Sequence, residues 1–361
     1  MALVRSVLII GGGVIGCASA LELAQAGCQV TLIDRGLIGG EASWAGAGLL
    51  SALLPWDYRE EVVRLMNQSR AIYPDWIAGL KHSGVDPEYR ASGLLVLPPY
   101  DLSQALNWAR DSNEVVETLP ASRIEPSLES EETALWMPQV AQVRNPRLLR
   151  ALHQSLIQQG VVVHESTALT GWLSDGSRIS GALTPRGSFE ADSYVMSSGA
   201  WSSEIVDGLQ ITDTPLPIRP MRGQIVLYKT SPGRLRHMLY RDGFYLIPRD
   251  DGHILAGSTL EDVGFDKQIT ADARQHLMQS AIALLPWLHA EPVLGHWAGL
   301  RPAAPDNLPI ISRHPKHENL YINSGHYRYG VTLAPASAQA LGDLMLERKS
   351  QFNLQDFAWP S

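Results

Sequence analysis

Apolar runs and helical spacings alternate at the start of the chain. Residues 7–10 are all apolar and predict a short buried strand, and residues 18–26 predict a helix that ends at Gly27. A second apolar run at residues 30–33 predicts another strand, which ends on Asp34. Strand, helix and strand in this order predict a βαβ unit with a parallel sheet.

The rest of the chain returns twice from β-rich segments to this α/β pattern. Residues 85–142 are interpreted as short strands and loops, and residues 215–260 as antiparallel strands with a turn at residues 250–252. Further strands are predicted at residues 93–97, 161–163, 193–196, 223–228, 244–247, 253–256 and 320–323. Further helices are predicted at residues 145–160, with Asn145 as the cap, and at residues 271–285 and 331–346. The domains are therefore expected to be discontinuous.

Composition narrows the class of protein. The chain has 361 residues, of which 45% are hydrophobic and 18% charged, as in soluble globular proteins of two domains. Its net charge of -8 argues against binding to nucleic acid or to an anionic membrane. No signal peptide or transmembrane segment is recognised, and the two cysteines, Cys17 and Cys28, form no disulfide framework. These features predict a cytoplasmic protein, and no ligand spacing predicts a metal site.

A glycine motif between the first strand and the first helix predicts a dinucleotide site. Gly11, Gly13 and Gly16 form GxGxxG, which permits a tight turn and lets a pyrophosphate approach the helix N-terminus. Asp34, at the end of the second strand, can accept hydrogen bonds from ribose hydroxyls and disfavours NADP. This motif alone leaves both NAD and FAD open.

Two further segments favour FAD. Residues 39–50 are rich in Gly and Ala, and lie where an extended FAD would continue from its pyrophosphate towards the flavin. Residues 322–345 predict a strand, a glycine turn and a helix. A helix N-terminus at the flavin pyrimidine edge would stabilise the negative charge that gathers there on reduction.

The sequence resembles the D-amino-acid oxidase family of flavoproteins, and within it the glycine-oxidising branch that serves thiamine biosynthesis. The resemblance runs from residue 7 to about residue 340. It rests on the segments VLIIGGGVIGCASALELA, GGEASWAGAGLL, VRNPRLL, SSGAWS, FYLIPRDDGHILAGSTLE, HWAGLRP and SGHYRYGVTLAPAS. HWAGLRP together with GHYR is much more specific than the dinucleotide motif.

The resemblance implies an α/β fold with a Rossmann-like FAD-binding domain and an antiparallel β-rich substrate domain. The FAD-binding domain would comprise residues 1–84, 143–208 and 296–361, and the substrate domain residues 85–142 and 209–295. No cysteine lies near residues 320–332, so the FAD is expected to be non-covalent. The residues implied to line FAD are Gly11, Gly12, Gly13, Val14, Ile15, Gly16, Asp34, Arg35, Ala42, Ser43, Ala47, Gly48, Leu49, Leu169, Ser198, Gly199, Trp201, Gly325, His326, Tyr327, Arg328, Tyr329, Gly330, Val331 and Thr332.

The substrate site implied by the resemblance contains two arginines and two tyrosines. Arg301 would bind the substrate carboxylate bidentately, on a turn stiffened by the prolines that follow it, and Arg328 would lie beside the flavin. Tyr240 and Tyr245 would add donors. Because they are five residues apart, strict alternation puts them on opposite faces unless residues 242–243 form a turn or bulge, so Tyr245 is favoured.

The reaction implied by the resemblance is hydride transfer from the substrate Cα to flavin N5, which gives an imine. Water hydrolyses the imine to an oxo acid and ammonia, and O2 becomes H2O2, so that glycine would give glyoxylate. The partners would be a small amino acid, O2 and further copies of the chain. Tyr329, Leu49 and Gly243 depart from relatives, which leaves open the preference among glycine, sarcosine and small D-amino acids.

Three other readings of the sequence remain. A sarcosine or D-amino-acid oxidase, or a dehydrogenase, would use the same scaffold. A tRNA-modifying flavoprotein is disfavoured by the net charge and by the lack of Lys/Arg clusters. A non-catalytic NAD-binding regulator would be colourless when purified.

Overall fold

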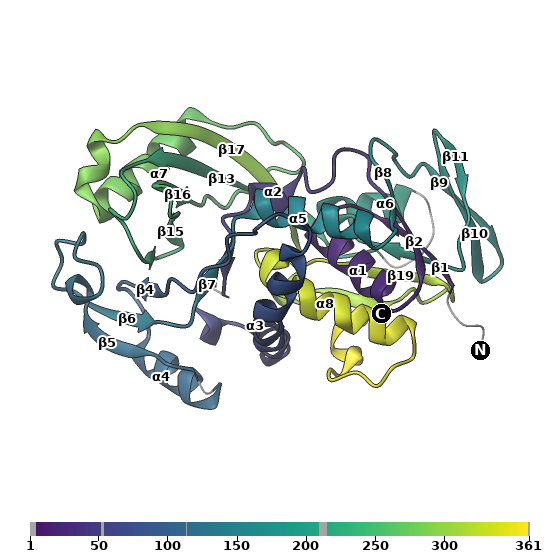
Figure 1. Ribbon diagram of the computed structural model, residues 1–361, viewed down its shortest axis with the longest axis horizontal. Coiled ribbons are helices and arrows are strands. Elements are labelled where there is room, and N and C mark those ends of the chain that lie inside the picture. The colour runs from purple at the N-terminus through teal and green to yellow at the C-terminus, as the bar shows by residue number, and fades with distance from the viewer. Residues whose placement is uncertain (1–4, 52–53, 113, 209–214, 360–361) are drawn as a thin grey trace.

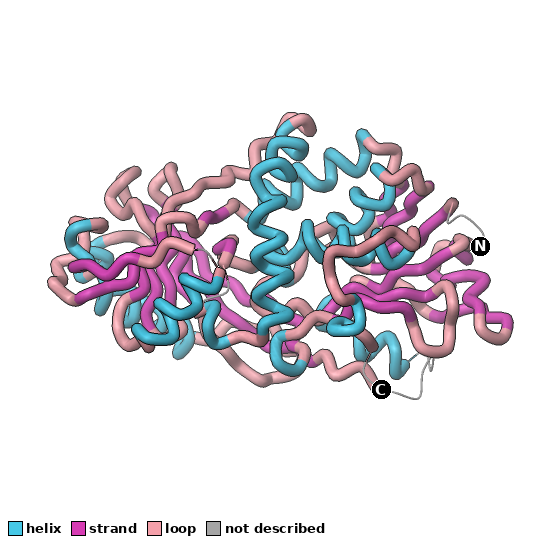
Figure 2. Tube along the Cα trace, turned by 90° about the horizontal axis from the view of Figure 1, so that it is seen from below, coloured by secondary structure: helices cyan, strands magenta, loops and turns pink. Residues whose placement is uncertain are grey.

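Two large sheets lie at opposite ends of an elongated molecule in the computed structural model (Figure 1), and most of the helices lie between them (Figure 2). The structure describes residues 5–51, 54–112, 114–208 and 215–359. Within these residues, no helix has both the length and the apolar character needed to cross a membrane. The helices are α1 (Val14–Gln25), α2 (Ala42–Ala45), α3 (Glu60–Lys81), α4 (Leu102–Asp111), α5 (Asn145–Gln158), α6 (Ser202–Gly208), α7 (Ala271–Leu284) and α8 (Gly330–Met345).

The six-stranded sheet forms because its central strands are apolar at nearly every position. In sheet order it comprises β18 (Ile310–Arg313), β19 (Leu320–Ser324), β12 (Ser193–Met196), β1 (Ser6–Ile10), β2 (Gln29–Ile33) and β8 (Val162–His164). All neighbours are parallel except β18 and β19. Strands covered on both faces read as continuous apolar runs, and β1 and β12 are buried at almost every residue.

Helices α1, α3, α5 and α8 supply much of the core beside this sheet. Leu23 of α1, Leu65 of α3 and Leu341 of α8 are all 0% exposed and belong to one hydrophobic cluster. Packing in this cluster holds α1 and α8 against the sheet. Both helices begin shortly after a parallel strand ends, so their N-termini lie near the carboxyl ends of β1 and β19. Ligands of open α/β sheets bind at that edge.

The eight-stranded sheet is almost entirely antiparallel. In sheet order it comprises β17 (Val293–Ala303), β13 (Arg219–Lys229), β16 (His253–Gly257), β15 (Phe244–Pro248), β14 (Met238–Arg241), β4 (Leu94–Val96), β6 (Thr133–Met137) and β5 (Glu117–Pro120). Only β14 and β4 are parallel. Helix α7 packs on β13 and β16, where its Leu277 and Ala281 join a second hydrophobic cluster.

Two small sheets complete the described strands. A three-stranded antiparallel sheet, visible at the right of Figure 1, contains β11 (Gly187–Phe189), β10 (Arg178–Thr184) and β9 (Gly171–Asp175). A two-stranded ladder pairs β3 (Leu49–Leu50) with β7 (Ala141–Gln142). This ladder joins the small-residue segment to the region that precedes α5.

The predicted α/β fold with a β-rich second part is confirmed, and several local predictions are wrong. Helix α1 begins at Val14 rather than at residue 18. The segment interpreted as strands and loops contains α4, which is capped by Asp101 and buries Ala105, Trp108 and Ala109 along one face. Helix α3 was not predicted, since polar residues and an internal proline interrupt its apolar pattern.

The segment around Arg301 is a strand rather than the predicted turn. Arg301 and Pro302 lie within β17, which pairs with β13 along almost its whole length. Pro302 is tolerated because β17 is an edge strand. The predicted domain boundary at residue 296 therefore falls inside β17. If the chain is divided by its sheets, this boundary moves to the end of β17 at Ala303, and we propose the other predicted boundaries unchanged.

Candidate functional site

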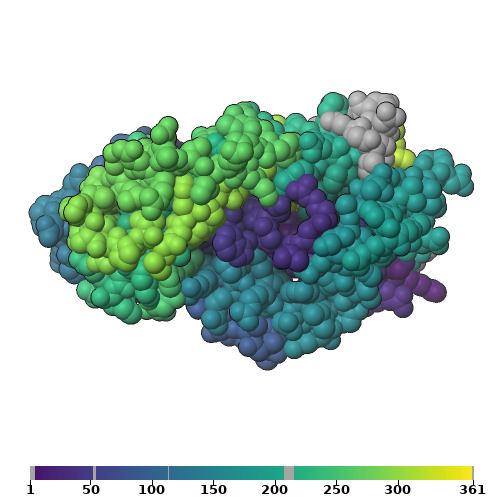
Figure 3. Space-filling model, turned by 90° about the horizontal axis from the view of Figure 1, so that it is seen from above, coloured from purple at the N-terminus to yellow at the C-terminus, as the bar shows by residue number. Residues whose placement is uncertain are grey.

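A cavity of about 690 Å³ lies between the two large sheets and is lined by residues of both. Its walls come from the ends of β1, β2, β12 and β19, from the starts of α1 and α8, and from β13, β15 and β17 of the other sheet. In the space-filling view, residues of the purple N-terminal part lie in a hollow between the green and teal parts (Figure 3). Such a volume is typical of a small-molecule or cofactor site.

Glycines make the cavity possible at three points of close backbone approach. A Cβ at Gly16 would come within 3.0 Å of the Gly11 carbonyl oxygen, and a Cβ at Gly11 would meet the carbonyl of Ser197. Gly48 has a φ of +75°, and a Cβ added there would overlap the carbonyl oxygen of Val143. The strand–turn–helix unit and the small-residue segment therefore close up around the cavity only because these residues lack side chains.

The N-terminus of α1 and the end of β2 provide complementary polar groups. The backbone N–H of Val14, the first residue of α1, points to Ser43 Oγ at 2.9 Å. The Asp34 carboxylate accepts from the N–H groups of Gly12 and Gly36, each at 2.7 Å. These bonds hold Asp34 at the cavity wall, where each carboxylate oxygen keeps a further lone pair for a ribose hydroxyl.

Asn145 was predicted to be a helix cap, but it is the first residue of α5 and Arg144 is the cap. Its side chain reaches the cavity wall and donates to the carbonyl oxygen of Ser43 at 2.7 Å. Asn145 thereby ties the Ser43 segment to the start of α5 beside the cavity. Ser197 and Ser198 also line the cavity, although their Oγ atoms are buried in its wall.

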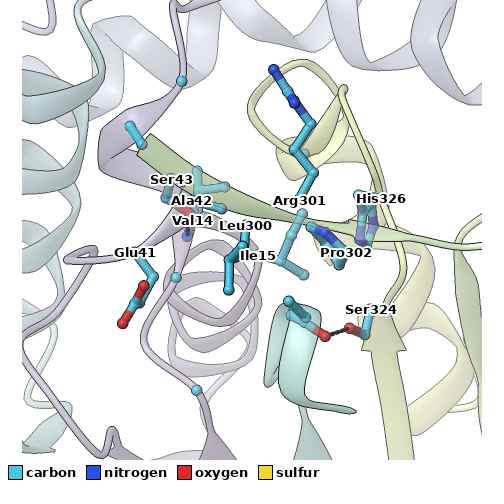
Figure 4. A pocket seen from close by; sticks show the side chains of 18 of the residues that line it. Val14, Ile15, Glu41, Ala42, Ser43, Leu300, Arg301, Pro302, Ser324 and His326 are labelled. Carbon is cyan, nitrogen blue, oxygen red and sulfur yellow. Dashed lines mark hydrogen bonds between the residues drawn. The ribbon is translucent and has the colours of Figure 1, made fainter. Parts of the chain in front are cut away.

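Arg301 reaches the cavity from β17. In Figure 4, Arg301 and Leu300 leave this strand on opposite sides, as neighbours on a strand do. Arg301 Nη2 donates to Ser258 Oγ at 2.7 Å, and Nη1 donates to the Thr259 carbonyl at 3.2 Å. Among the described residues, no Asp or Glu forms an ion pair with Arg301. Burial lowers its pKa, yet a guanidinium stays charged, so a positive charge faces the cavity without an acidic partner.

The two candidate tyrosines are directly opposite each other in the β14–β15 hairpin. Asp242 and Gly243 form the turn, with φ of 46° and 82°. Tyr240 and Tyr245 therefore pair across the strands and share a face. Tyr245 lines the cavity, whereas Tyr240 does not and its hydroxyl accepts from the N–H of Gly243 at 3.0 Å. The turn left open by the sequence is confirmed, and only Tyr245 lies at the cavity.

Arg328 lines the cavity at the start of α8, among aromatic side chains. Its guanidinium carbon lies 5.4 Å from the centre of the Tyr327 ring. The neighbouring Tyr329 is 4% exposed, and its hydroxyl pairs with that of Tyr58. Arg328 also lies close enough to Arg301 to lower the pKa of the latter, after burial itself. The cavity therefore carries two arginine charges at this end.

Most of the residues predicted for the cofactor line the cavity. These are Gly11, Gly13, Val14, Ile15, Asp34, Arg35, Ala42, Ser43, Ala47, Gly48, Leu49, Leu169, Ser198, Gly199, Trp201, His326, Tyr327, Arg328, Tyr329, Gly330 and Val331. Four of the predicted residues lie behind the cavity walls and do not line it: Gly12, Gly16, Gly325 and Thr332. Thr332, for example, donates to the Leu49 carbonyl at 3.1 Å.

Several lining residues were not predicted. They include Glu41, Asn145, Ser197, Gly223, Ser258 and Gly299. Except for Gly223, these residues belong to segments that carried the resemblance, so the segments could have indicated them. Gly223 had no local signal, since it matters only through its pairing with Gly299 across β13 and β17.

His326 makes the stability of the protein sensitive to acid. It is 1% exposed, its Nε2 lies 2.9 Å from Ser337 Oγ, and burial lowers its pKa to about 3. The unfolded chain binds the proton below about pH 6.5 while the folded protein does not, so stability falls as the pH drops from there towards 3. The loss is on the order of 2 kcal/mol at pH 5.

A His326→Gln variant is therefore expected to lose less stability between pH 7 and pH 5 than the wild type. Urea unfolding of both proteins at the two pH values measures this difference. His314, whose pKa burial lowers to about 4, is present in both proteins and cancels. Equal losses in the two proteins would show that His326 is not the group responsible.

Comparison with known proteins gives matches along almost the whole chain. The model of the family described as FAD dependent oxidoreductase (DAO) matches residues 6–344. The chain is 44% identical over 349 residues to the glycine oxidase of Pseudomonas aeruginosa, with 95% of each protein covered. It is 33% identical over 366 residues to the bifunctional protein ThiO/ThiG of Trichormus variabilis. That alignment covers 98% of this chain and 54% of the ThiO/ThiG protein.

The fold matches solved structures equally well. The crystal structure of glycine oxidase from Geobacillus kaustophilus superposes with a TM-score of 0.91 at 29% identity and covers 99% of both chains. An iminodiacetate oxidase from Chelativorans superposes with a TM-score of 0.88 at 25% identity over 98% of both chains. The resemblance inferred from short motifs is thus confirmed over the full length of the fold.

Proposed function

Because the chain belongs to the family of FAD-dependent oxidoreductases, we propose that it oxidises glycine and other small amines or D-amino acids with O2. The products from glycine are glyoxylate, ammonia and H2O2. The observation that carries this proposal is Arg301, a cavity arginine without an acidic partner among the described residues, which comes from the eight-stranded sheet, whereas the dinucleotide motif follows β1 of the six-stranded sheet. Similarity to glycine oxidases supports the choice of substrate.

The cavity fits FAD. Its walls close up because Gly11, Gly16 and Gly48 lack a Cβ, which would overlap neighbouring backbone, and Asp34 and the α1 N-terminus suit a ribose and a pyrophosphate. The start of α8, from Tyr329 to Val331, would hold the flavin end. When bound, FAD supplies the two-electron oxidation, taking a hydride from the substrate Cα and passing the electrons to O2.

Arg301 orients the substrate by its carboxylate. The guanidinium fork binds a carboxylate through two parallel hydrogen bonds, which fixes the direction of the bond to Cα. Thr259 and Ser258 accept one hydrogen bond each from Nη1 and Nη2, which leaves one N–H on each of these nitrogens for the substrate. Tyr245 lies against Arg301 and adds a hydroxyl donor there. Arg328 adds a second positive charge, which strengthens the attraction for a carboxylate.

The chain needs no general base in this scheme, provided that the amine binds in its neutral form. The amine is then free to donate its lone pair as the Cα–H bond breaks, and water completes the reaction by hydrolysing the imine. The contribution of the protein is therefore positioning and charge complementarity rather than proton transfer. The apolar walls around Ile225 and Leu300 limit the water that reaches Cα before the hydride leaves.

A substrate panel tests the proposed function. Purified protein loaded with FAD is assayed for O2 uptake and H2O2 with glycine, sarcosine, D-alanine and L-alanine. Glycine is expected to support turnover, and D-alanine to be favoured over L-alanine. If neither glycine nor any of the other amines supported O2 uptake or the reduction of an artificial acceptor, the proposal would be overturned. Reduction of an artificial acceptor but not of O2 would identify a dehydrogenase instead.

A Gly223→Ala variant is expected to raise KM for glycine with a smaller effect on FAD content. Gly223 lies on β13 beside β17, and a Cβ there would overlap the Arg301 guanidinium. Arg301 must then turn away from Ser258, which misplaces its fork. Steady-state kinetics and the flavin content of the purified protein measure the two effects. A KM equal to that of the wild type would show that Arg301 lies elsewhere when substrate binds.

We also propose two broader properties. The similarity to a ThiO/ThiG protein supports a role of glycine oxidation in thiamine biosynthesis, which the sequence resemblance implies. We further propose that the chain forms a homo-oligomer with non-covalent FAD. Size-exclusion chromatography with light scattering measures the oligomeric state. Release of free flavin on denaturation shows whether the FAD is non-covalent.

A further inference from the structure

The two residues that hold Arg301 belong to a short segment that continues from β16 alongside β13. Ser258 and Thr259 follow directly after β16, and Thr259 is tied to β13 by both its backbone and its side chain. Its Oγ1 accepts from the Gln224 N–H at 2.9 Å and donates to Glu261 Oε1 at 2.5 Å. The position of the Thr259 carbonyl, which accepts from Arg301, therefore depends on Glu261.

Glu261 is the centre of a polar network behind Arg301. Its Oε2 accepts from Arg222 Nη2 at 2.6 Å, and its Oε1 also accepts from Gln224 Nε2 at 2.9 Å. Both partners are buried, since Arg222 is 4% exposed and Gln224 0%. Burial raises the pKa of Glu261, but the hydrogen bonds from Thr259, Arg222 and Gln224 outweigh it and keep the pKa below its ordinary value. Glu261 is therefore ionised at neutral pH.

The arrangement separates the acid from the arginine that faces the cavity. A carboxylate in contact with Arg301 would occupy its fork and compete with the substrate. Glu261 forms its ion pair with Arg222 instead and reaches Arg301 only through Thr259. Arg222 also has a second acid, Asp266, at 2.8 Å, so Glu261 is not its sole counterion.

We propose that Glu261 is a positioning residue for substrate binding: it holds Thr259, and through Thr259 it holds the Arg301 guanidinium in the orientation that receives a carboxylate. This inference rests on the proposed function, because it assumes that Arg301 binds the substrate carboxylate. It goes beyond that function by assigning a role to a residue that does not line the cavity.

The test is the affinity of the FAD-loaded protein for acetate, a carboxylate without an amine, measured by titration calorimetry. A Glu261→Gln variant is expected to bind acetate about tenfold more weakly than the wild type, within the range of coupling between contacting residues. The matched control is Asp266→Asn, which removes the other acid of Arg222 but does not contact Thr259. Its acetate affinity is expected to stay within twofold of the wild type.

A second pair of variants follows the path through Thr259. Thr259→Val removes the hydroxyl but keeps the carbonyl, and is expected to weaken acetate binding, while Thr259→Ser restores it. Adding Thr259→Val to Glu261→Gln is expected to cause little further loss, because both changes break the same link. Flavin content and melting temperature are measured for every variant. Should Glu261→Gln not fold, the two Thr259 variants decide the question.

The outcomes separate this inference from the proposed function. If wild-type protein binds acetate no better than an Arg301→Ala variant, the proposed role of Arg301 is wrong. If Arg301→Ala abolishes binding but Glu261→Gln binds like the wild type, only the role of Glu261 is wrong. An equal loss in Glu261→Gln and Asp266→Asn would also overturn it, because the effect would then run through the charge on Arg222.

Discussion

Replacing Arg301 by alanine is expected to lower kcat/KM for glycine by about 30-fold to about 5,000-fold while the protein keeps its FAD. Loss of one partner of a buried, hydrogen-bonded charge pair costs about 2–5 kcal/mol, and each 1.4 kcal/mol is about tenfold. Arg301 is the cavity arginine held by Ser258 and Thr259, and it comes from the eight-stranded sheet, whereas the dinucleotide motif follows β1 of the six-stranded sheet. Steady-state kinetics and the flavin content of the same preparation measure both parts of this prediction.

Arg219→Ala is the matched control for Arg301. Arg219 lies on the paired strand β13 but is exposed and bonded to Asp262 on the surface, so its loss is expected to leave kcat/KM unchanged. Arg301→Lys is expected to recover part of the activity, because lysine restores the charge but not the fork. Wild-type kinetics in Arg301→Ala would remove Arg301 from the substrate site.

Replacing Gly16 by alanine is expected to yield protein that is largely free of flavin. The added Cβ would overlap the carbonyl oxygen of Gly11, and backbone cannot move aside as a flexible side chain can. Either the turn after β1 opens or α1 shifts, and in both cases the N–H groups at the start of α1 leave the pyrophosphate. Titration with FAD, followed by flavin fluorescence, is expected to show at least about a hundredfold weaker binding, or about 3 kcal/mol.

Gly79→Ala controls for the chemical change itself. Gly79 lies in α3, where an added Cβ would meet nothing within 4 Å, so alanine is expected to stabilise the helix slightly and to leave FAD binding unchanged. Near-UV circular dichroism of the Gly16→Ala apoprotein tests whether the fold survives. Normal FAD affinity in Gly16→Ala would mean that the cofactor does not lie on this turn.

Elements with a strong local signal could be predicted from the sequence. β1 and β12 are almost wholly buried, so their apolar runs stand out, and the glycine motif marks the turn that precedes α1. The cofactor end of the cavity is built largely from such segments. Most of the residues proposed to hold FAD therefore line the cavity, whereas Gly12, Gly16, Gly325 and Thr332 do not.

The substrate end depends on contacts between distant segments, which the sequence hides. Arg301 was predicted to lie in a turn because proline usually interrupts helices and strands. Pro302 nevertheless lies within β17, because β17 is at the edge of the sheet. Asn145 was interpreted as a cap, although its side chain supports Ser43, 102 residues earlier. Gly223 carries no local signal, since its role comes from pairing with β17. Glu261 lies in a segment that carried the resemblance, but its role comes only from its contact with Thr259.

The most direct test of the central claim is the visible absorbance of the purified protein before and after anaerobic addition of glycine. The account predicts the two-band spectrum of bound, oxidised flavin, which glycine bleaches and which returns when O2 is admitted, with glyoxylate and H2O2 as products. A colourless protein that cannot be loaded with FAD would contradict the cofactor. A flavin spectrum that glycine, sarcosine and D-alanine all leave unchanged would contradict the proposed reaction.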